Sequence, residues 1–368
     1  MNSKWELFKL WLKTPKGKRI VIFSIIALVV LSVAGYVVYN RYFKKNIQES
    51  KNANLTIDVK KEKVEEKVVS NLNGLKYTKD VANRHPIAVM VENHPDARPQ
   101  AGLDKAAIIY EAEAEGGITR FMAIYGPEDA SMVGPVRSAR TYYLDWALEY
   151  DAFYAHCGGN MDALELIPQI GIKDINQFQY GEEAFWREDL NVDTEHTMFT
   201  DISKLRDIAK NNGWTTSTSD FTPFKFKTDA DESTRPATQK IYVNFSSDLW
   251  NVVWEYDPAT NTYIRYMAGE PHKDRVNGNQ LAAKNIIVQE VTRSLTTTSI
   301  NEVGWAMNTV GSGTAVVFMD GKRIDATWKK DTRNDRTIFY DPSGAEIEFN
   351  PGQTWYQIVP SMGDLAVE

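Results

Sequence analysis

The chain has 368 residues, of which 43% are hydrophobic and 25% charged, a balance typical of globular proteins. Its 42 basic and 49 acidic residues give a formal net charge of −7, which argues against a general nucleic-acid-binding protein. The single cysteine, Cys157, excludes an intrachain disulfide and a metal cluster held by several thiolates.

An uncharged apolar run from residue 20 to residue 39 is long enough to cross a hydrocarbon core of roughly 30 Å. A cleaved signal peptide would have a shorter apolar region, and no cysteine follows the run as a site for lipid attachment. Six basic residues precede the run and three follow it. The positive-inside rule therefore predicts a single-pass signal anchor in the cell membrane, with residues 1–19 as a cytoplasmic basic tail and the main body extracytoplasmic.

The region from residue 40 to residue 80 is rich in Lys, Glu and Asn and holds few large apolar side chains. Such a composition cannot bury enough apolar surface to fold alone, so we expect a stalk or linker there. A folded region begins abruptly at Pro86–Glu92, a continuous apolar run that is typical of a strand buried on both faces.

Strands and helices alternate from residue 81 to about residue 230. Apolar runs indicate strands at 107–111, from 120 and at 152–156, and helical patterns begin after Ser138, at Asn160 and at Thr200. We expect Pro168 to end the second of these helices and Gly213 the third. The alternation predicts an α/β domain with a mixed or parallel central sheet flanked by helices.

The region from residue 231 to residue 368 changes character, because short strand-like runs separated by turn residues replace the helical patterns. Strands are expected at 241–245, 252–256, 263–266 and 355–359, and hairpins around Asp320-Gly321 and Asp341–Gly344. This pattern predicts a β-rich C-terminal domain, although some of its strands could instead complete the first sheet.

The stretch Gly134–Arg140 (Gly-Pro-Val-Arg-Ser-Ala-Arg) places Arg137 and Arg140 at an expected helix start, with Ser138 as the N-cap. The positive end of a helix favours anions, so two arginines there indicate a bound anion held by their guanidinium forks. We expect Arg98 and Arg120 at the same edge, because ligands of open α/β sheets bind where strands end. The alternative is a structural network in which the arginines pair with neighbouring carboxylates, namely Glu92, Glu111, Glu113 and Glu115.

A second strand–glycine–helix turn follows at His156–Asn160. We expect His156 to contact a ligand or to make structural hydrogen bonds, and Asn160 to cap the helix and join the ligand site. Cys157 is interpreted as a small packing residue, because a nucleophile needs a positioned base and a lowered pKa. The five histidines do not fall at metal-ligand spacings, so we assign no metal ligands among them. Oxygen ligands for a divalent ion that bridges to phosphate could come from Glu92, Asp96, Glu111, Glu113 and Glu115, so a metal requirement stays open, and catalytic residues and cofactors are left unknown.

Four ordered motifs resemble the YerB family of bacterial extracytoplasmic proteins, whose function is unknown. They are Asn93…Ala97–Leu103, Glu115–Phe121, Gly134–Arg140 and His156–Gly159. The resemblance covers nearly everything after residue 80 and implies an N-terminal domain at 81–230 and a C-terminal domain at 231–368. Many members of that family look like lipoproteins, whereas this chain has an apolar anchor.

The chain also resembles, more loosely, the LytR–CpsA–Psr enzymes, which move lipid-pyrophosphate-linked polymers onto the cell wall. The order of the Val136–Arg140 loop and the Tyr154–Gly159 segment is similar, and Arg137 would match that family's loop arginine. Ser138 stands where that family usually has aspartate, which puts its metal-binding arrangement in doubt.

These observations favour a membrane-anchored cell-envelope protein that binds an anionic or glycan ligand through an arginine-lined cleft. The ligand would bear phosphate or carboxylate, and an envelope polymer, a lipid-linked precursor or an envelope protein are the partners considered. Two alternatives stay open. One is a phosphotransferase that acts on lipid-pyrophosphate-linked polymer, and the other is a non-catalytic interaction scaffold; whether the chain is an enzyme is left undecided.

Overall fold

The computed structural model describes residues 3–44, 66–217 and 220–368. The chain divides into two compact units, Met1–Val64 and Glu65–Glu368, and each is described by itself.

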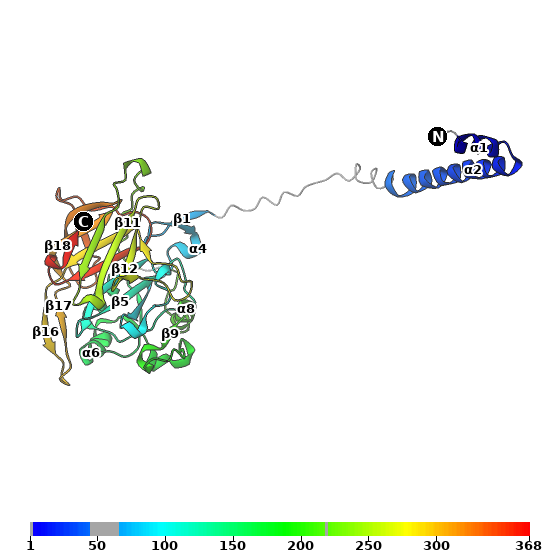
Figure 1. Ribbon diagram of the computed structural model, residues 1–368. Coiled ribbons are helices and arrows are strands. Elements are labelled where there is room, and N and C mark those ends of the chain that lie inside the picture. Colours follow the sequence, from blue (N-terminus) through cyan, green and yellow to red (C-terminus); the bar gives the residue numbers. More distant parts are fainter. Residues whose placement is uncertain (1–2, 45–65, 218–219) are drawn as a thin grey trace. The chain divides into compact units, whose positions relative to one another are not determined.

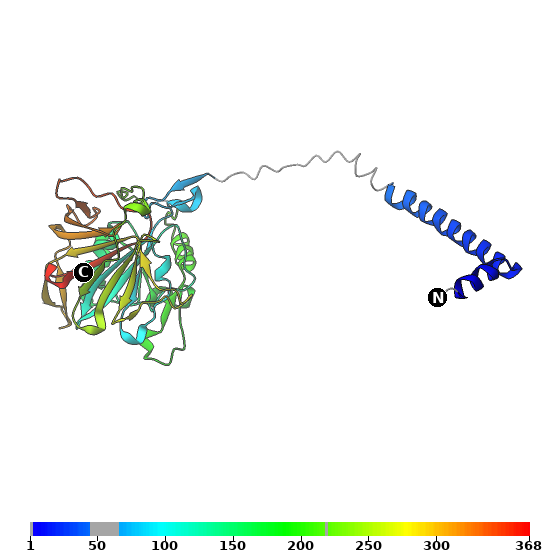
Figure 2. The same cartoon turned by 45° about the horizontal axis from the view of Figure 1, so that its top comes forward.

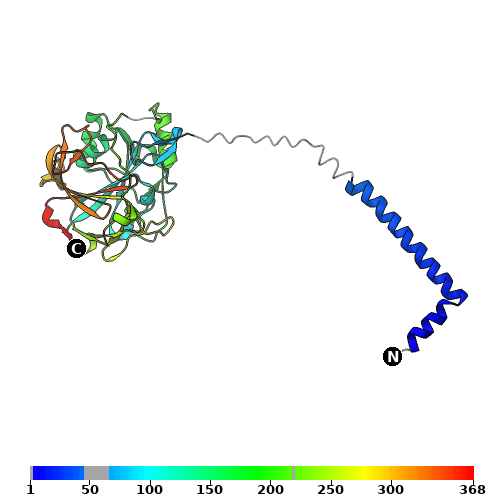
Figure 3. The same ribbon diagram turned by 90° about the horizontal axis from the view of Figure 1, so that it is seen from above.

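The first unit consists of two helices joined at a sharp bend, α1 (Ser3–Leu12) and α2 (Pro15–Val38), followed by the π-helical turn Tyr39–Lys44 (Figure 3). Thr14 caps α2 by accepting a hydrogen bond from the backbone N–H of Gly17 at 3.0 Å. At 1.5 Å per residue α2 is about 36 Å long, which exceeds the roughly 30 Å of a hydrocarbon core. It is long and apolar enough to cross a membrane, and its side chains are exposed.

A ten-stranded mixed sheet forms the centre of the second unit (Figure 1). In spatial order its strands are β20 (Ile338–Tyr340), β19 (Lys322–Lys330), β18 (Gly311–Met319), β15 (Asn285–Glu290), β21 (Thr354–Val359), β4 (Ile108–Glu115), β5 (Ile118–Tyr125), β3 (Ile87–Glu92), β6 (Phe153–His156) and β7 (Lys173–Asn176). β3, β6 and β7 run parallel, as do β15, β21 and β4, and the other neighbours are antiparallel.

Half of this sheet comes from the last third of the chain. β21 lies between β15 and β4 and pairs with both, so the central sheet is continuous across the expected division near residue 230. Residues 65–368 accordingly form one compact unit.

A second, six-stranded sheet packs on one face of the first, as Figure 2 shows. Its strands are β10 (Lys240–Asn244), β11 (Asn251–Asp257), β12 (Thr262–Met267), β13 (Glu270–Pro271), β14 (Ala282–Ala283) and β22 (Leu365–Val367). In β11 and β12 every second residue is buried, whereas all six residues of β3 are buried. This is the pattern expected when one sheet has a solvated face and the other is covered on both.

Helices cover the opposite face of the ten-stranded sheet. α5 (Thr141–Leu148) and α6 (Met161–Ile170) contribute Tyr143, Trp146 and Ala163 to the core on that side. α8 (Ile202–Asn211) packs instead into the core that the two sheets share. The short helices α4 (Lys79–Ala82) and α7 (Gln177–Tyr180) complete the set within the described ranges.

Three small hairpins complete the second unit: β1 (Lys67–Val69) with β2 (Lys76–Thr78), β8 (Phe185–Arg187) with β9 (Met198–Thr200), and β16 (Arg293–Thr297) with β17 (Val303–Met307). The folded unit thus begins before residue 81, with Leu72 already in the core. The rest of the expected stalk falls mainly on residues 45–65, outside the described residues.

Two expected helix boundaries are wrong. α5 begins at Thr141 rather than after Ser138, because residues 133–139 are held extended by bridges from Val133 to Thr200 and from Val136 to Val91. α6 passes through Pro168 and ends at Ile170, followed by the capping residue Gly171, whose φ of 69° is left-handed. The N-cap of α6 is Asn160, as predicted. The N-cap of α8 is Asp201, one residue after the predicted Thr200.

Candidate functional site

A pocket of about 360 Å³ lies at the carboxyl ends of the parallel strands β3, β6 and β7. Ligands of open α/β sheets bind at this position, because the loops that follow parallel strands meet there. The extended stretch 133–139, the turn after β6 and the β8–β9 hairpin form its walls. The pocket is lined, among others, by Arg137, Ser138, Cys157, Asn176, Phe178, Arg187 and Glu195.

Arg137 is held in the pocket wall by its backbone and by two carboxylates. Its backbone N–H donates to the carbonyl of Met90 at 2.9 Å. Nε lies 2.9 Å from Oε2 of the buried Glu92, and Nη2 lies 3.3 Å from Oε2 of Glu195. The side chain keeps 23% of its surface exposed, so its guanidinium is oriented but open to a ligand.

Arg187 supplies a second guanidinium to the same pocket, and the sequence motifs gave no reason to select it. It ends strand β8 and is exposed. It donates to the carbonyl of Thr194 and to Oγ1 of Thr197 at 3.3 Å. No carboxylate of the described residues lies within ion-pair distance of it, so its charge is not neutralised inside this part of the chain.

The other three predicted arginines do not line this pocket. Arg120 and Arg140 share Glu115, with N–O distances of 2.8 Å and 2.5 Å. Burial raises the pKa of Glu115, but the two guanidinium groups outweigh that effect and hold the pKa below its usual value. Arg98 donates to Asn93 Oδ1 at 3.1 Å and to the carbonyl of Leu249 at 2.8 Å.

The polar residues beside these arginines support the pocket walls. The carbonyl of Ser138 accepts from Arg120 at 2.8 Å, and Asn160 caps α6 by accepting from the backbone N–H of Ala163 at 3.3 Å. His156 is fully buried, with Nδ1 2.6 Å from the carbonyl of Gly158 and Nε2 2.7 Å from Asp174 Oδ1. Both ring nitrogens are therefore engaged within the fold.

Cys157 lines the pocket but does not have the surroundings of a nucleophile. Its Sγ lies 3.5 Å from Oε1 of Gln177. Burial raises the pKa of the thiol, although Arg187 and Arg137 oppose this. Both ring nitrogens of the adjacent His156 are engaged, by the carbonyl of Gly158 and by Asp174, so His156 is not placed to accept the thiol proton.

A neighbouring hollow of about 530 Å³ shares two lining residues with the pocket, Arg187 and Met198. Two aromatic side chains stand along this path. Phe178 is 78% exposed at the pocket, and Trp186 lines the hollow with Lys204 above its ring at 5.1 Å. The two hollows thus offer cationic groups, one exposed aromatic side chain, Phe178, and a partly exposed one, Trp186, beside the carboxylate of Glu182.

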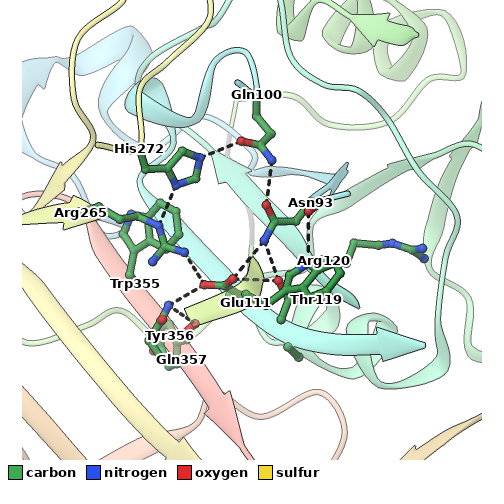
Figure 4. Close-up of polar contacts among 12 residues, drawn as sticks. Asn93, Gln100, Glu111, Thr119, Arg120, Arg265, His272, Trp355, Tyr356 and Gln357 are labelled. Atoms are coloured by element: carbon green, nitrogen blue, oxygen red, sulfur yellow. Dashed lines mark hydrogen bonds and ion pairs between the residues drawn. The ribbon is translucent and has the colours of Figure 1, made fainter. Parts of the chain in front are cut away.

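A separate polar network lies buried between the two sheets (Figure 4). Glu111 on β4 accepts from Arg265 on β12 at 2.7 Å, and both side chains are fully buried. Arg265 Nε donates to His272 at 2.9 Å, and burial, followed by the charges of Arg265 and Arg98, lowers the pKa of His272 well below its usual value. The remaining members are Asn93, Gln100, Thr119 and Gln357. This network links the sheets and is not part of the pocket.

Comparisons with known proteins identify the family. Residues 72–215 match "Protein of unknown function (DUF3048) N-terminal domain", and residues 241–356 match the C-terminal domain of the same family. The chain belongs to the DUF3048 family, which includes YerB.

The relatives of this DUF3048 protein are bacterial. It is 32% identical over 306 residues to a Bacillus subtilis (strain 168) protein named "Putative lipoprotein YerB", covering 82% of this chain and 89% of the relative. It also matches the crystal structure of YerB from Bacillus subtilis with a TM-score of 0.73 and 29% identity, over 82% of this chain and 99% of that chain. These matches confirm the YerB resemblance and do not bear on the LytR–CpsA–Psr enzymes, so that resemblance stays a hypothesis.

Proposed function

We propose that this DUF3048 protein is a membrane-anchored extracytoplasmic protein that binds an anionic saccharide in the pocket at the carboxyl ends of β3, β6 and β7. The observation that carries the proposal is the exposed Arg187, which lines the pocket together with Arg137 and has no ion-pair partner within the described residues.

The charges in the pocket favour an anion. Arg137 is already paired with the buried Glu92 and with Glu195, whereas Arg187, which lines the same pocket, has no ion-pair partner within the described residues. A phosphate or carboxylate group would pair with Arg187 and could also accept from the open side of Arg137, since planar guanidinium forks match such oxygens well. Phe178 and Trp186 offer apolar faces beside the charges, which suits a sugar ring that bears the anionic group.

This proposal narrows the predicted ligand residues. Arg137 and Ser138 stay in the ligand site, and Arg187 joins them. Arg98, Arg120, Arg140, His156 and Asn160 act as supports, since each makes the internal contacts described above.

Replacing Arg187 with glutamine is expected to weaken binding of a phosphorylated oligosaccharide about tenfold, because a charge-assisted hydrogen bond is lost. The affinity is measured with the full chain in detergent, and the dephosphorylated sugar serves as the reference ligand. Arg323→Gln, at an exposed site on β19, is the matched control and keeps wild-type affinity. Equal affinities for both sugars, or no effect of Arg187→Gln, would contradict the proposal.

We also propose that α2 anchors the chain with its N-terminus in the cytoplasm, in place of the lipid that the relative's name implies. The six basic residues before the apolar run support this orientation. Protease added to intact cells is then expected to remove the second unit and leave an epitope tag at the N-terminus protected. Digestion of that tag in intact cells would show that the N-terminus lies outside the cell and would contradict the proposed orientation.

A further inference from the structure

A second group of chemically capable side chains lies next to Arg137. This His94 cluster consists of His94, Asp96 and His196, and one ligand atom of each lies within 4.8 Å of one ligand atom of the others. His94 and Asp96 follow strand β3, whereas His196 belongs to the 3₁₀ turn Thr194–His196 before β9. Because His196 is far in sequence from His94 and Asp96, spacing in the chain does not reveal the cluster.

The orientation of the His196 ring is fixed by its neighbour Glu92. His196 is 4% exposed, and its Nδ1 lies 3.1 Å from Glu92 Oε2, the same oxygen that is 2.9 Å from Nε of Arg137. With Nδ1 turned toward Glu92, the other ring nitrogen, Nε2, points away from it and is the atom that can meet an ion. Metal-binding histidines are oriented in this way by a carboxylate behind the ring.

His94 and Asp96 complete the cluster from its more exposed side. The rings of His94 and His196 are stacked, with centroids 4.6 Å apart and an interplanar angle of 7°. His94 Nδ1 lies 3.6 Å from Asp96 Oδ2 and accepts from the Asp96 backbone N–H at 3.3 Å. Because two parallel stacked rings cannot both direct a nitrogen at one ion, binding requires the His94 ring to leave the stack and turn toward the ion beside His196, and its one-third exposure leaves room for that rotation.

The charges around the two imidazoles favour a cation. Glu92, Asp96 and Glu195 contribute three carboxylates, and Arg137 contributes one positive charge that contacts two of them. Nε2 of His196 lies 3.6 Å from Glu195 Oε1, which is too long for a hydrogen bond. The negative balance and the available imidazole nitrogen therefore coincide.

We propose that His94, Asp96 and His196 bind one divalent transition-metal ion of the Zn²⁺ class. Two imidazoles and one carboxylate suit zinc and related ions, whereas Mg²⁺ prefers oxygen ligands throughout. Three protein ligands leave a coordination position open for water or a ligand oxygen. The metal site borders the anion pocket through Arg137 and Glu195, but its test uses the metal alone and does not depend on anion binding.

Isothermal titration of the full chain with Zn²⁺ tests the site. The protein is purified in detergent without a histidine tag and freed of metal with a chelator. We expect one zinc ion per chain. Asp96→Asn and His94→Ala should each lower the zinc affinity by more than about tenfold, because removing a direct ligand should cost at least as much as removing an outer-shell partner. Both side chains are partly or largely exposed, so the variants are expected to fold, which near-ultraviolet circular dichroism checks.

Asp248→Asn is the matched control, because Asp248 is likewise an exposed aspartate in the first turn of a 3₁₀ helix, Asp248–Trp250. It should bind zinc as the wild type does, and Mg²⁺ should not compete at equal concentration. Absence of stoichiometric zinc binding would overturn the proposal. So would unchanged affinity in both folded variants, or equally tight binding of Mg²⁺.

Discussion

Replacing Arg265 with methionine is expected to lower the free energy of unfolding by about 3–5 kcal/mol, because Glu111 would stay buried without its cation. Both side chains are fully buried, and Nη2 of Arg265 lies 2.7 Å from Glu111 Oε2. Arg265 also lies over the rings of Trp355 and Trp254, at 4.2 Å and 4.9 Å from their centroids. Methionine keeps most of that packing, so the loss reports mainly on the charge.

Urea unfolding of the full chain, followed by far-ultraviolet circular dichroism, measures this difference. The control is Arg323→Met, whose exposed ion pair with Asp325 is worth at most about 1 kcal/mol. A loss for Arg265→Met no larger than for Arg323→Met would show that the buried pair does not stabilise the contact between the sheets.

Replacing Lys330 with methionine is expected to lower the free energy of unfolding by a similar amount, about 3–5 kcal/mol, because it also leaves a buried carboxylate, Glu149, without its cation. Lys330 Nζ lies 2.8 Å from Glu149 Oε1, and neither side chain is exposed. Nζ also donates to the carbonyls of Asp145 and Asp335, at 3.1 Å and 2.8 Å. The substitution therefore leaves a buried carboxylate and two carbonyls short of a donor, although Thr337 still donates to Glu149.

The neighbouring Lys329 provides a close control on the same strand. Its Nζ contacts Asp331 at 2.9 Å, but both side chains are more than half exposed. Lys329→Met should change the free energy of unfolding far less than Lys330→Met, because an exposed ion pair contributes little to stability. Equal effects of the two substitutions in the same urea series would refute the assigned role of the Lys330–Glu149 pair.

Both buried pairs join one family segment to the other. Glu111 and Glu149 lie within residues 72–215, whereas Arg265 and Lys330 lie within residues 241–356. Together with β21 between β4 and β15, they make the two segments interdependent. We therefore expect one cooperative unfolding transition for the second unit in each of these experiments.

The sequence predicted those helices and strands whose signals lie within the element itself or within a few residues of it. β3 is a continuous apolar run because both its faces are covered, and Asn160 caps α6 through a contact three residues away. The neighbours of β21 were not predictable in this way, because its pairing with β4 joins segments far apart in the chain. The β-rich pattern of the last third was correct, but the pattern does not say which sheet each strand enters.

The candidate site was predicted only in part, for related reasons. The motif around Arg137 drew attention to the correct loop, yet bridges to Val91 and Thr200 hold that loop extended and displace the helix start. Arg187 carries no motif, since only the β8–β9 hairpin brings it to the pocket. The one local feature that could have pointed to Arg187 is its position directly after two large aromatic residues in the strand Phe185–Arg187.

A crystal structure of the full chain with a phosphorylated oligosaccharide tests the central claim most directly. The account predicts phosphate density within hydrogen-bond distance of Arg137 and Arg187, with sugar density toward Phe178. Phosphate bound at Arg98, Arg120 or Arg140 instead, or a pocket without ligand at saturating concentration, would contradict it.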